Sequence, residues 1–259
     1  MPLNFSRKLT GKHRSVDANR QLGLALAFVA GATNAGGFLA VQMYTSHMTG
    51  VVSSMADNLA LGHVDIVLAA LGALLSFICG AAVSALLVNY SRLHGLHSQF
   101  ALPLMLEACL LLVFGLLGAR LSDIDGLFVS ITVMLLSFIM GLQNAVITKL
   151  SNAEIRTTHI TGIVTDIGIE LGKLAYRNNP SSALADQVFA NRPRLALLSM
   201  LALAFFAGGV VGALGFKHVG YSATLPLALV LVALASVPIV DDLIGYLQNR
   251  KSSSRHPPS

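Results

Sequence analysis

Charge is scarce in this sequence, and its scarcity excludes most classes of water-soluble protein. Asp, Glu, Lys and Arg make up 11% of the 259 residues, whereas hydrophobic residues make up 54% and the mean hydropathy is +0.71. Such a chain contains more long apolar runs than one soluble domain can bury in a single core. We therefore expect an integral membrane protein whose main partner is the lipid bilayer.

Signatures of catalysis, metal binding and nucleic-acid binding are missing as well. The sequence contains no Gly-rich phosphate loop, no nucleophile elbow and no Cys-x-x-Cys or His-x-x-x-His spacing. Its basic residues stand at the ends and between apolar runs, not along one amphipathic face. We expect no enzyme, no cofactor, no metal and no nucleic-acid partner. Cys79 and Cys109 lie inside apolar runs and are predicted to be packing groups without a disulfide.

Six apolar runs are long enough to cross a hydrocarbon core as helices, which takes about 20 residues. They cover residues 22–41, 65–89, 101–119, 127–148, 195–216 and 222–245. Two segments with more polar residues, 46–62 and 158–174, are predicted to be short or re-entrant helices. The predicted fold is an all-α integral membrane protein with six long transmembrane helices and two short ones.

Basic residues indicate the orientation, because cytoplasmic loops are enriched in Lys and Arg. With six crossings and a cytoplasmic N-terminus, 15 of the 17 Lys and Arg residues lie on the cytoplasmic side. If both short segments also crossed, 13 of the 17 would do so. The count favours six crossings in a bacterial inner membrane, with both ends of the chain in the cytoplasm.

The chain also contains an internal repeat. Gly31-Ala-Thr-Asn-Ala35 corresponds to Gly141-Leu-Gln-Asn-Ala145, and Thr45-Ser-His-Met-Thr-Gly50 corresponds to Thr157-Thr-His-Ile-Thr-Gly162. Downstream, Phe77, Gly80, Ser84 and Ala85 match Phe205, Gly208, Gly212 and Ala213. Three crossings in each half would make the two repeats inverted, whereas four in each would make them parallel.

These repeats define the predicted domains. A basic cytoplasmic arm (1–21) precedes one membrane domain, which consists of repeat 1 (22–119) and repeat 2 (127–245). The Ser/Pro-rich tail (246–259) is predicted to be disordered in the cytoplasm.

The duplicated motifs are similar to those of the YoaK family of bacterial polytopic membrane proteins. The resemblance runs from about residue 22 to 245 and rests on the Asn-Ala pairs and the paired Thr-x-x-Thr-Gly motifs described above. It implies a multi-pass membrane protein of undefined function. The sequence departs from the family pattern at Asn34, where Asp is common, and at Val51, where Asn often follows the glycine.

Helical spacing places polar residues on one face of each short segment. The first face carries His47, Gly50, Ser54 and Asn58, and the second carries His159, Gly162, Asp166 and Glu170. The glycines have two open roles, either close helix contact or exposure of N–H donors to an anionic or polar ligand, and Thr49 and Thr161 either cap the helix or bind that ligand. Asn34 and Asn144 hydrogen-bond either to the broken backbone or to the ligand.

Carboxylates at membrane depth are costly and therefore indicate function. Asp166, Glu170 and Glu107 are candidates for proton coupling, although Glu107 could equally be a neutral hydrogen-bond donor that faces the bundle interior. The leading hypothesis is a small secondary transporter or permease for a small polar or anionic solute. A membrane scaffold or assembly protein without transport is the alternative, a membrane enzyme ranks third, and homo-oligomerisation stays open.

Overall fold

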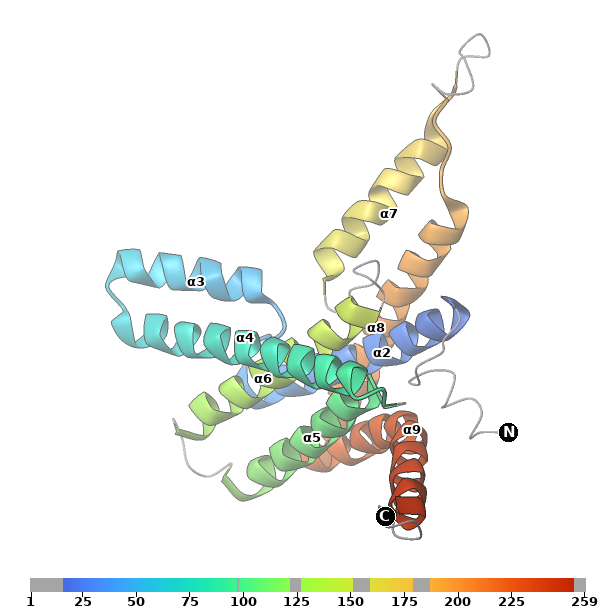
Figure 1. Ribbon diagram of the computed structural model, residues 1–259. Coiled ribbons are helices and arrows are strands. Elements are labelled where there is room, and N and C mark those ends of the chain that lie inside the picture. Colours follow the sequence, from blue (N-terminus) through green and yellow to red (C-terminus); the bar gives the residue numbers. More distant parts are fainter. Residues whose placement is uncertain (1–15, 97, 122–126, 151–158, 179–186, 254–259) are drawn as a thin grey trace.

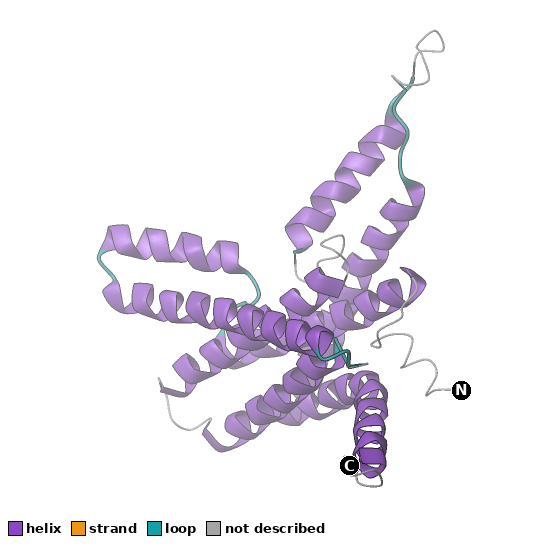
Figure 2. Cartoon of the chain, viewed as in Figure 1, coloured by secondary structure: helices purple, strands orange, loops and turns teal. Residues whose placement is uncertain are grey.

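The computed structural model describes residues 16–96, 98–121, 127–150, 159–178 and 187–253, and every regular element among them is helical (Figure 1, Figure 2). The long helices are α2 (Val16–Val41), α4 (Val64–Leu93), α5 (Ala101–Leu121), α6 (Leu127–Leu150), α8 (Arg192–Val219) and α9 (Thr224–Ser253). The short helices are α3 (Met48–Leu61) and α7 (Ile160–Ala175), and a 3-10 turn, η2 (Gly220–Ala223), joins α8 to α9. The predicted all-α fold is confirmed.

The helix ends correct two predicted boundaries. Helix α2 begins at Val16, so part of the predicted N-terminal arm is helical. Helix α9 continues to Ser253, so residues 246–253 are helical rather than disordered. The apolar spacing of Leu243, Ile244 and Leu247 maintains a helical period beyond the end of the predicted span, whereas the prediction relied on the polar composition of the tail.

Five stretches of the described helices are long and apolar enough to cross a membrane. They are Asn19–Val41, Val64–Leu93, Ala101–Ala119, Ser130–Lys149 and Arg192–Ile244. The last stretch is 53 residues long and includes both α8 and α9, over which the sequence predicted two spans. Neither α3 nor α7 reaches the length of a crossing, in agreement with the prediction that they are short.

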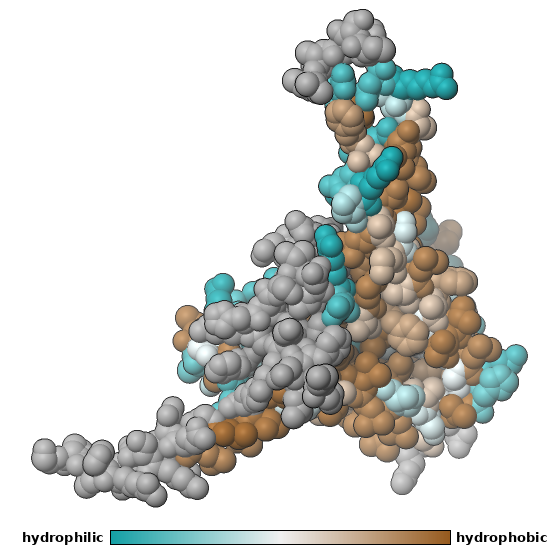
Figure 3. Space-filling model, turned by 90° about the vertical axis from the view of Figure 1, so that its right-hand side faces the viewer, coloured by the Kyte–Doolittle hydropathy of each residue, from teal (hydrophilic) through white to brown (hydrophobic). Residues whose placement is uncertain are grey.

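Apolar side chains cover much of the molecular surface, and Figure 3 shows them across the bundle. Leu86, Leu203, Phe206 and Leu229 are each about two-thirds exposed in the structure. Exposed side chains of this size on long apolar helices are stable only in contact with lipid. Cys79 and Cys109 are also exposed and free, so the prediction that they pack inside the bundle is wrong.

Two close helix crossings use residues that the predicted repeats match with one another. In the α2–α8 crossing, a side chain on Gly31 would collide with the Phe205 carbonyl oxygen, and one on Gly208 would collide with that of Phe28. In the α4–α6 crossing, a side chain on Gly141 would collide with the Phe77 carbonyl oxygen, and one on Gly80 would collide with that of Phe138. Glycine is therefore needed for close backbone approach at these points. The matched motifs of the sequence make matched contacts.

The helices that open and close the two repeats run antiparallel to each other. Gln143 Nε2 of α6 donates to the Leu26 carbonyl of α2 over 3.3 Å, whereas a side chain on Gly37, further along α2, would touch Leu136, earlier in α6. Near its end, α5 contacts the first residue of α9 at Gly115 and Thr224, and it contacts the preceding turn η2 at Gly118 and Tyr221. Just before α5 begins, Ser98 N donates to Asp242 Oδ2 in the later part of α9 over 2.8 Å.

Candidate functional site

The chain turns back after α2 and runs alongside that helix before α3 begins. Gln42 has a positive φ of 53°, which reverses the chain direction. Tyr44 then stacks on Phe38, with ring centroids 4.5 Å apart. Ser46 Oγ donates to Asn34 Oδ1 over 2.8 Å, although Asn34 lies about two helical turns before the end of α2. Helix α3 therefore starts beside the interior of α2 rather than beyond its end.

The Ser46 contact favours one of the two predicted roles of Asn34. Its side chain is 9% exposed and binds the segment that leads into the short helix, as the scaffold interpretation expects. The corresponding Asn144 donates from Nδ2 to the Met140 carbonyl of its own helix over 2.9 Å. The segment after α6 that corresponds to Ser46, residues 151–158, lies outside the described residues.

Both short helices begin with a histidine whose ring lies over the glycine three residues later. His47 is the N-cap residue of α3, and a side chain on Gly50 would come within 2.7 Å of His47 Nδ1. His159 is the N-cap residue of α7, and a side chain on Gly162 would collide with its Nδ1. The glycines thus make room for an imidazole of the same helix. At both positions the three atoms nearest to an added side chain belong to that imidazole.

The first backbone N–H groups of both short helices are available to a ligand. The helical bonding begins with Val51 N to the His47 carbonyl and with Ile163 N to the His159 carbonyl, each at 3.1 Å. Neither histidine side chain caps its helix, and the three N–H groups that precede each of these bonds have no acceptor among the described residues. Thr49 and Thr161 are exposed beside them.

At its other end, α3 is joined to α4 by an amide and an imidazole side chain. Asn58 Nδ2 donates to the Ser54 carbonyl at 2.7 Å, and Asn58 Oδ1 lies 3.1 Å from Nδ1 of His63, the N-cap residue of α4. Gly62, with φ of 79°, allows the tight left-handed turn between the two helices. Ser54 and Asn58 of the predicted polar face therefore lie toward the turn between α3 and α4.

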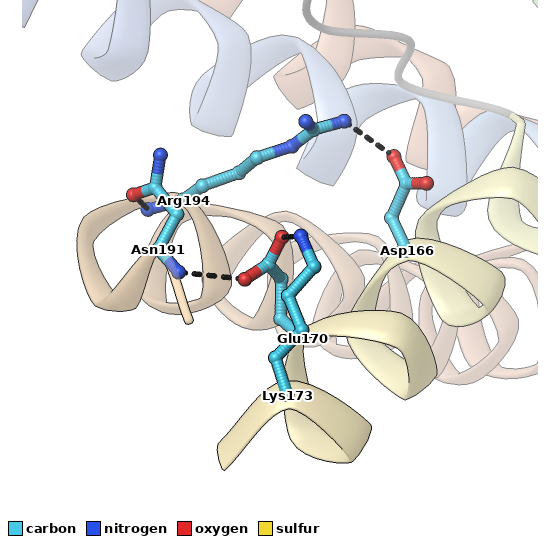
Figure 4. Close-up of polar contacts among 5 residues, drawn as sticks. All are labelled: Asp166, Glu170, Lys173, Asn191 and Arg194. Carbon is cyan, nitrogen blue, oxygen red and sulfur yellow. Dashed lines mark hydrogen bonds and ion pairs between the residues drawn. The ribbon is translucent and has the colours of Figure 1, made fainter. Parts of the chain in front are cut away.

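Helix α7 is joined to α8 by charged side chains (Figure 4). Arg194 Nη2 donates to Asp166 Oδ2 over 2.9 Å, and Lys173 Nζ donates to Glu170 Oε1 over 2.8 Å. Glu170 Oε2 accepts the Asn191 backbone N–H over 2.6 Å, while Asn191 Oδ1 caps α8 by accepting from Arg194 N over 3.0 Å. The hydrogen bond from Lys173, followed by the one from Asn191, lowers the pKa of Glu170.

The sequence-based prediction identified the carboxylates of this junction but not their partners. Asn191 followed by Arg-Pro-Arg is a recognisable helix start, since Asn is favoured at the N-cap and Pro in the first turn. Reading α8 from Asn191 would have placed Arg194 in its first turn. The approach of that turn to Asp166 depends on the folding back of α7 along α8, which no spacing in the sequence reveals.

The two polar faces lie on separate hairpins, α3–α4 and α7–α8, which point in different directions from the bundle (Figure 1). His47, Ser54 and His159 are exposed, Gly50, Gly162, Asn144 and Asp166 are partly exposed, and Glu170 is buried. The structure joins Asp166 and Glu170 in one junction but does not bring α3 against α7. Glu107 lies on α5, fully buried as predicted, and neither carboxylate oxygen has a partner among the described residues.

The apolar helices, their lipid-facing surfaces and the two short helices define a multi-pass helical membrane protein. A family model described as "Protein of unknown function (DUF1275)" matches residues 22–237, and the chain therefore belongs to this family. It is also 28% identical over 165 residues to the "UPF0700 transmembrane protein YoaK" of Bacillus subtilis (strain 168), a match that covers 63% of this chain and 72% of that protein. The predicted YoaK resemblance is confirmed. No solved structure matches the chain.

Proposed function

We propose that this protein is a small permease of the bacterial inner membrane, with six crossings, two inverted halves and both ends in the cytoplasm. The antiparallel packing of α2 against α6 and of α5 against α9 supports this topology. Equivalent helices of two repeats are antiparallel only when each repeat has an odd number of crossings. Four crossings per half would make α2 parallel to α6.

Cysteine labelling distinguishes the two topologies. Leu61→Cys at the end of α3 and Tyr176→Cys at the end of α7 are introduced separately into a Cys79→Ala, Cys109→Ala background. A membrane-impermeant maleimide added to intact cells labels position 61, whereas position 176 requires access from the cytoplasm. Labelling of both positions from the same side would contradict the inverted arrangement.

The transported solute is a small polar or anionic molecule, and the hydrogen bond from Ser46 to Asn34 is the observation that carries this proposal. That bond holds the start of α3 beside the interior of α2, so its free N–H groups and the positive end of its helix dipole lie at membrane depth. Anionic groups bind well to such donors. Broken helices at matching positions of two inverted repeats commonly form transport sites.

The charged junction between α7 and α8 would couple transport of the solute to the movement of a proton. A proton that neutralises Asp166 removes its attraction to Arg194 of α8, and a proton on Glu170 weakens the hydrogen bond that it accepts from the Asn191 N–H at the start of α8. Protonation would thereby favour separation of α7 from α8 on the cytoplasmic side. Glu107, a buried carboxyl group without a partner among the described residues, would pass the proton through the bundle.

Uptake into proteoliposomes tests the permease directly. Inorganic phosphate, sulfate and acetate serve as probes, with and without an inward proton gradient. Ser46→Ala removes the bond that positions α3 and is expected to abolish uptake of the probe that is transported. Ser53→Ala alters an exposed serine of the same helix and should leave uptake unchanged. Equal uptake by both variants would remove the α3 start from the mechanism.

A membrane scaffold without transport activity is the second candidate, and the exposure of His47, Ser54 and His159 favours it. In a scaffold, these residues would contact another protein rather than a solute. Crosslinking in cells from cysteines at positions 47 and 159 distinguishes the two functions. A scaffold gives discrete crosslinked species and no uptake by the wild-type protein.

A further inference from the structure

The last part of α9 extends beyond the bundle. Asp242 Oδ2 accepts from Ser98 N over 2.8 Å, just before α5 begins at Ala101. Since α5 and α9 run antiparallel, α5 has no residues alongside the part of α9 that follows Asp242. That part extends from Leu243 to Ser253, or about 16 Å of helix at 1.5 Å per residue.

Helix α9 also changes direction along its length, and Figure 1 shows its last part leaving the bundle. Pro238 lies inside the helix. Proline has no N–H to donate, and its ring collides with the carbonyl group four residues earlier, so it bends a helix at a defined point. The residues after Pro238 therefore need not follow the direction of the span that precedes them.

An apolar stripe runs along this last part. Val240, Leu243, Ile244 and Leu247 follow the spacing of one helical face, and each is between 48% and 57% exposed. Asp242 lies on the opposite face, where it binds Ser98. The stripe thus points away from the contact that holds the helix to the protein, and the sequence continues with Arg250 and Lys251.

We infer that Leu243–Ser253 is an interfacial helix, which lies in the headgroup region of the bilayer at the end of its own span. The apolar stripe contacts lipid, because the segment continues directly from an apolar span and the helix bends out of the bundle at Pro238. Apolar side chains on one face with basic residues near the helix end are typical of helices at a membrane surface. Tyr246, 64% exposed, is a side chain that favours this depth.

The absence of tryptophan from the chain permits a clean test. The full-length protein is reconstituted in vesicles of mixed zwitterionic and anionic phospholipid, with bromine either near the headgroup or deep in the acyl chain. Ile244→Trp is expected to lose more fluorescence with the shallow bromine. Leu229→Trp, at an exposed position in the apolar first half of the same helix, is the control and should lose more with the deep one. Leu247→Trp replaces Ile244→Trp if the latter fails to elute as a single folded species.

Each other outcome would overturn the interfacial position. Stronger quenching of Ile244→Trp by the deep bromine would mean that α9 continues through the hydrocarbon. Red-shifted emission without quenching would place the stripe in water, and blue-shifted emission without quenching would mean that another copy of the chain covers it. The result does not depend on transport, so it stands or fails separately from the permease.

Discussion

The α3–α4 and α7–α8 hairpins begin in the same way and end differently. Each short helix starts with a histidine folded over a glycine, and each folds back along the long helix that follows. Asn58 and His63 then join the first hairpin without an acidic side chain, whereas in the second Arg194 pairs with Asp166 across the two helices and Lys173 pairs with Glu170 within α7. Residues Ser54 and Asp166 occupy corresponding positions in the two halves, as do Asn58 and Glu170.

The distribution of cations along the chain accounts for this difference. No Lys or Arg occurs between Arg20 and Arg92, so the first hairpin has no cation of its own to neutralise a carboxylate. The second hairpin lies in the basic part of the sequence. If the two hairpins open to opposite sides of the membrane, the rule that cytoplasmic segments are basic explains why only one of them uses ion pairs. The comparison thus links topology to local chemistry.

The largest expected loss of stability comes from replacing the glycines at the two close helix crossings, α2–α8 and α4–α6. Gly31→Val and Gly141→Val each force a branched side chain against a backbone carbonyl, and each is expected to cost about 3 kcal/mol of stability. The yield of monodisperse protein in detergent and its Tm measure the loss. Gly172→Val, at a helical glycine with open space around it, is the matched control. Tolerance at only one of the two crossings would show that the halves are not equivalent.

Glu170→Ala is expected to lower the Tm by several degrees, and more than Asn58→Ala at the corresponding position. The Glu170 side chain is 4% exposed and accepts hydrogen bonds from both Lys173 Nζ and the Asn191 N–H, so its removal takes away the contact between α7 and the start of α8 together with an ion pair. The Asn58 contacts are exposed, and water replaces them. Thermal unfolding of the two variants under one condition measures the difference. Equal shifts would mean that the charge at the second junction adds no stability.

Acid should loosen the second hairpin and spare the first. The pKa of Glu170 is lowered in the folded protein, so its contribution is present above the ordinary pKa of 4.5 and is lost as the pH falls through the lowered value. Spin-label distances measure the loosening: the distance between α7 and α8 should increase as the pH falls, whereas the distance between α3 and α4 should not change. An increase at both hairpins in the same pH range would point to general acid unfolding instead.

The smallest expected effect is that of the Asp166–Arg194 pair on stability. Both side chains are substantially exposed, 39% and 55%, so the pair contributes about 0–1 kcal/mol. A double-mutant cycle with Asp166→Asn and Arg194→Gln measures the coupling energy. The same Asp166→Asn protein should nevertheless lose proton-coupled uptake. A large coupling energy with unchanged uptake would make the pair a structural contact only.

Spacing in the sequence was sufficient to place the helices and the repeat motifs, because lipid requires long uninterrupted apolar helices. The prediction of short helices at 46–62 and 158–174 agrees closely with α3 and α7. Sequence reasoning did not identify Arg194 as the partner of Asp166, because the two residues are 28 positions apart. The pair of Lys173 with Glu170 has an i,i+3 spacing within α7, which the sequence alone could have revealed. It also misjudged Cys79 and Cys109, since an apolar run has both lipid-facing and bundle-facing sides.

The sequence by itself determined a multi-pass helical membrane protein with two sets of matching motifs, since hydropathy and repetition are properties of the chain alone. The tertiary structure decided the direction of α6 relative to α2, the return of Ser46 to Asn34 and the pairing of Asp166 with Arg194. All three depend on contacts between residues distant in the sequence. Such contacts are set by how helices pack in space, and a pattern along one helix carries no record of them.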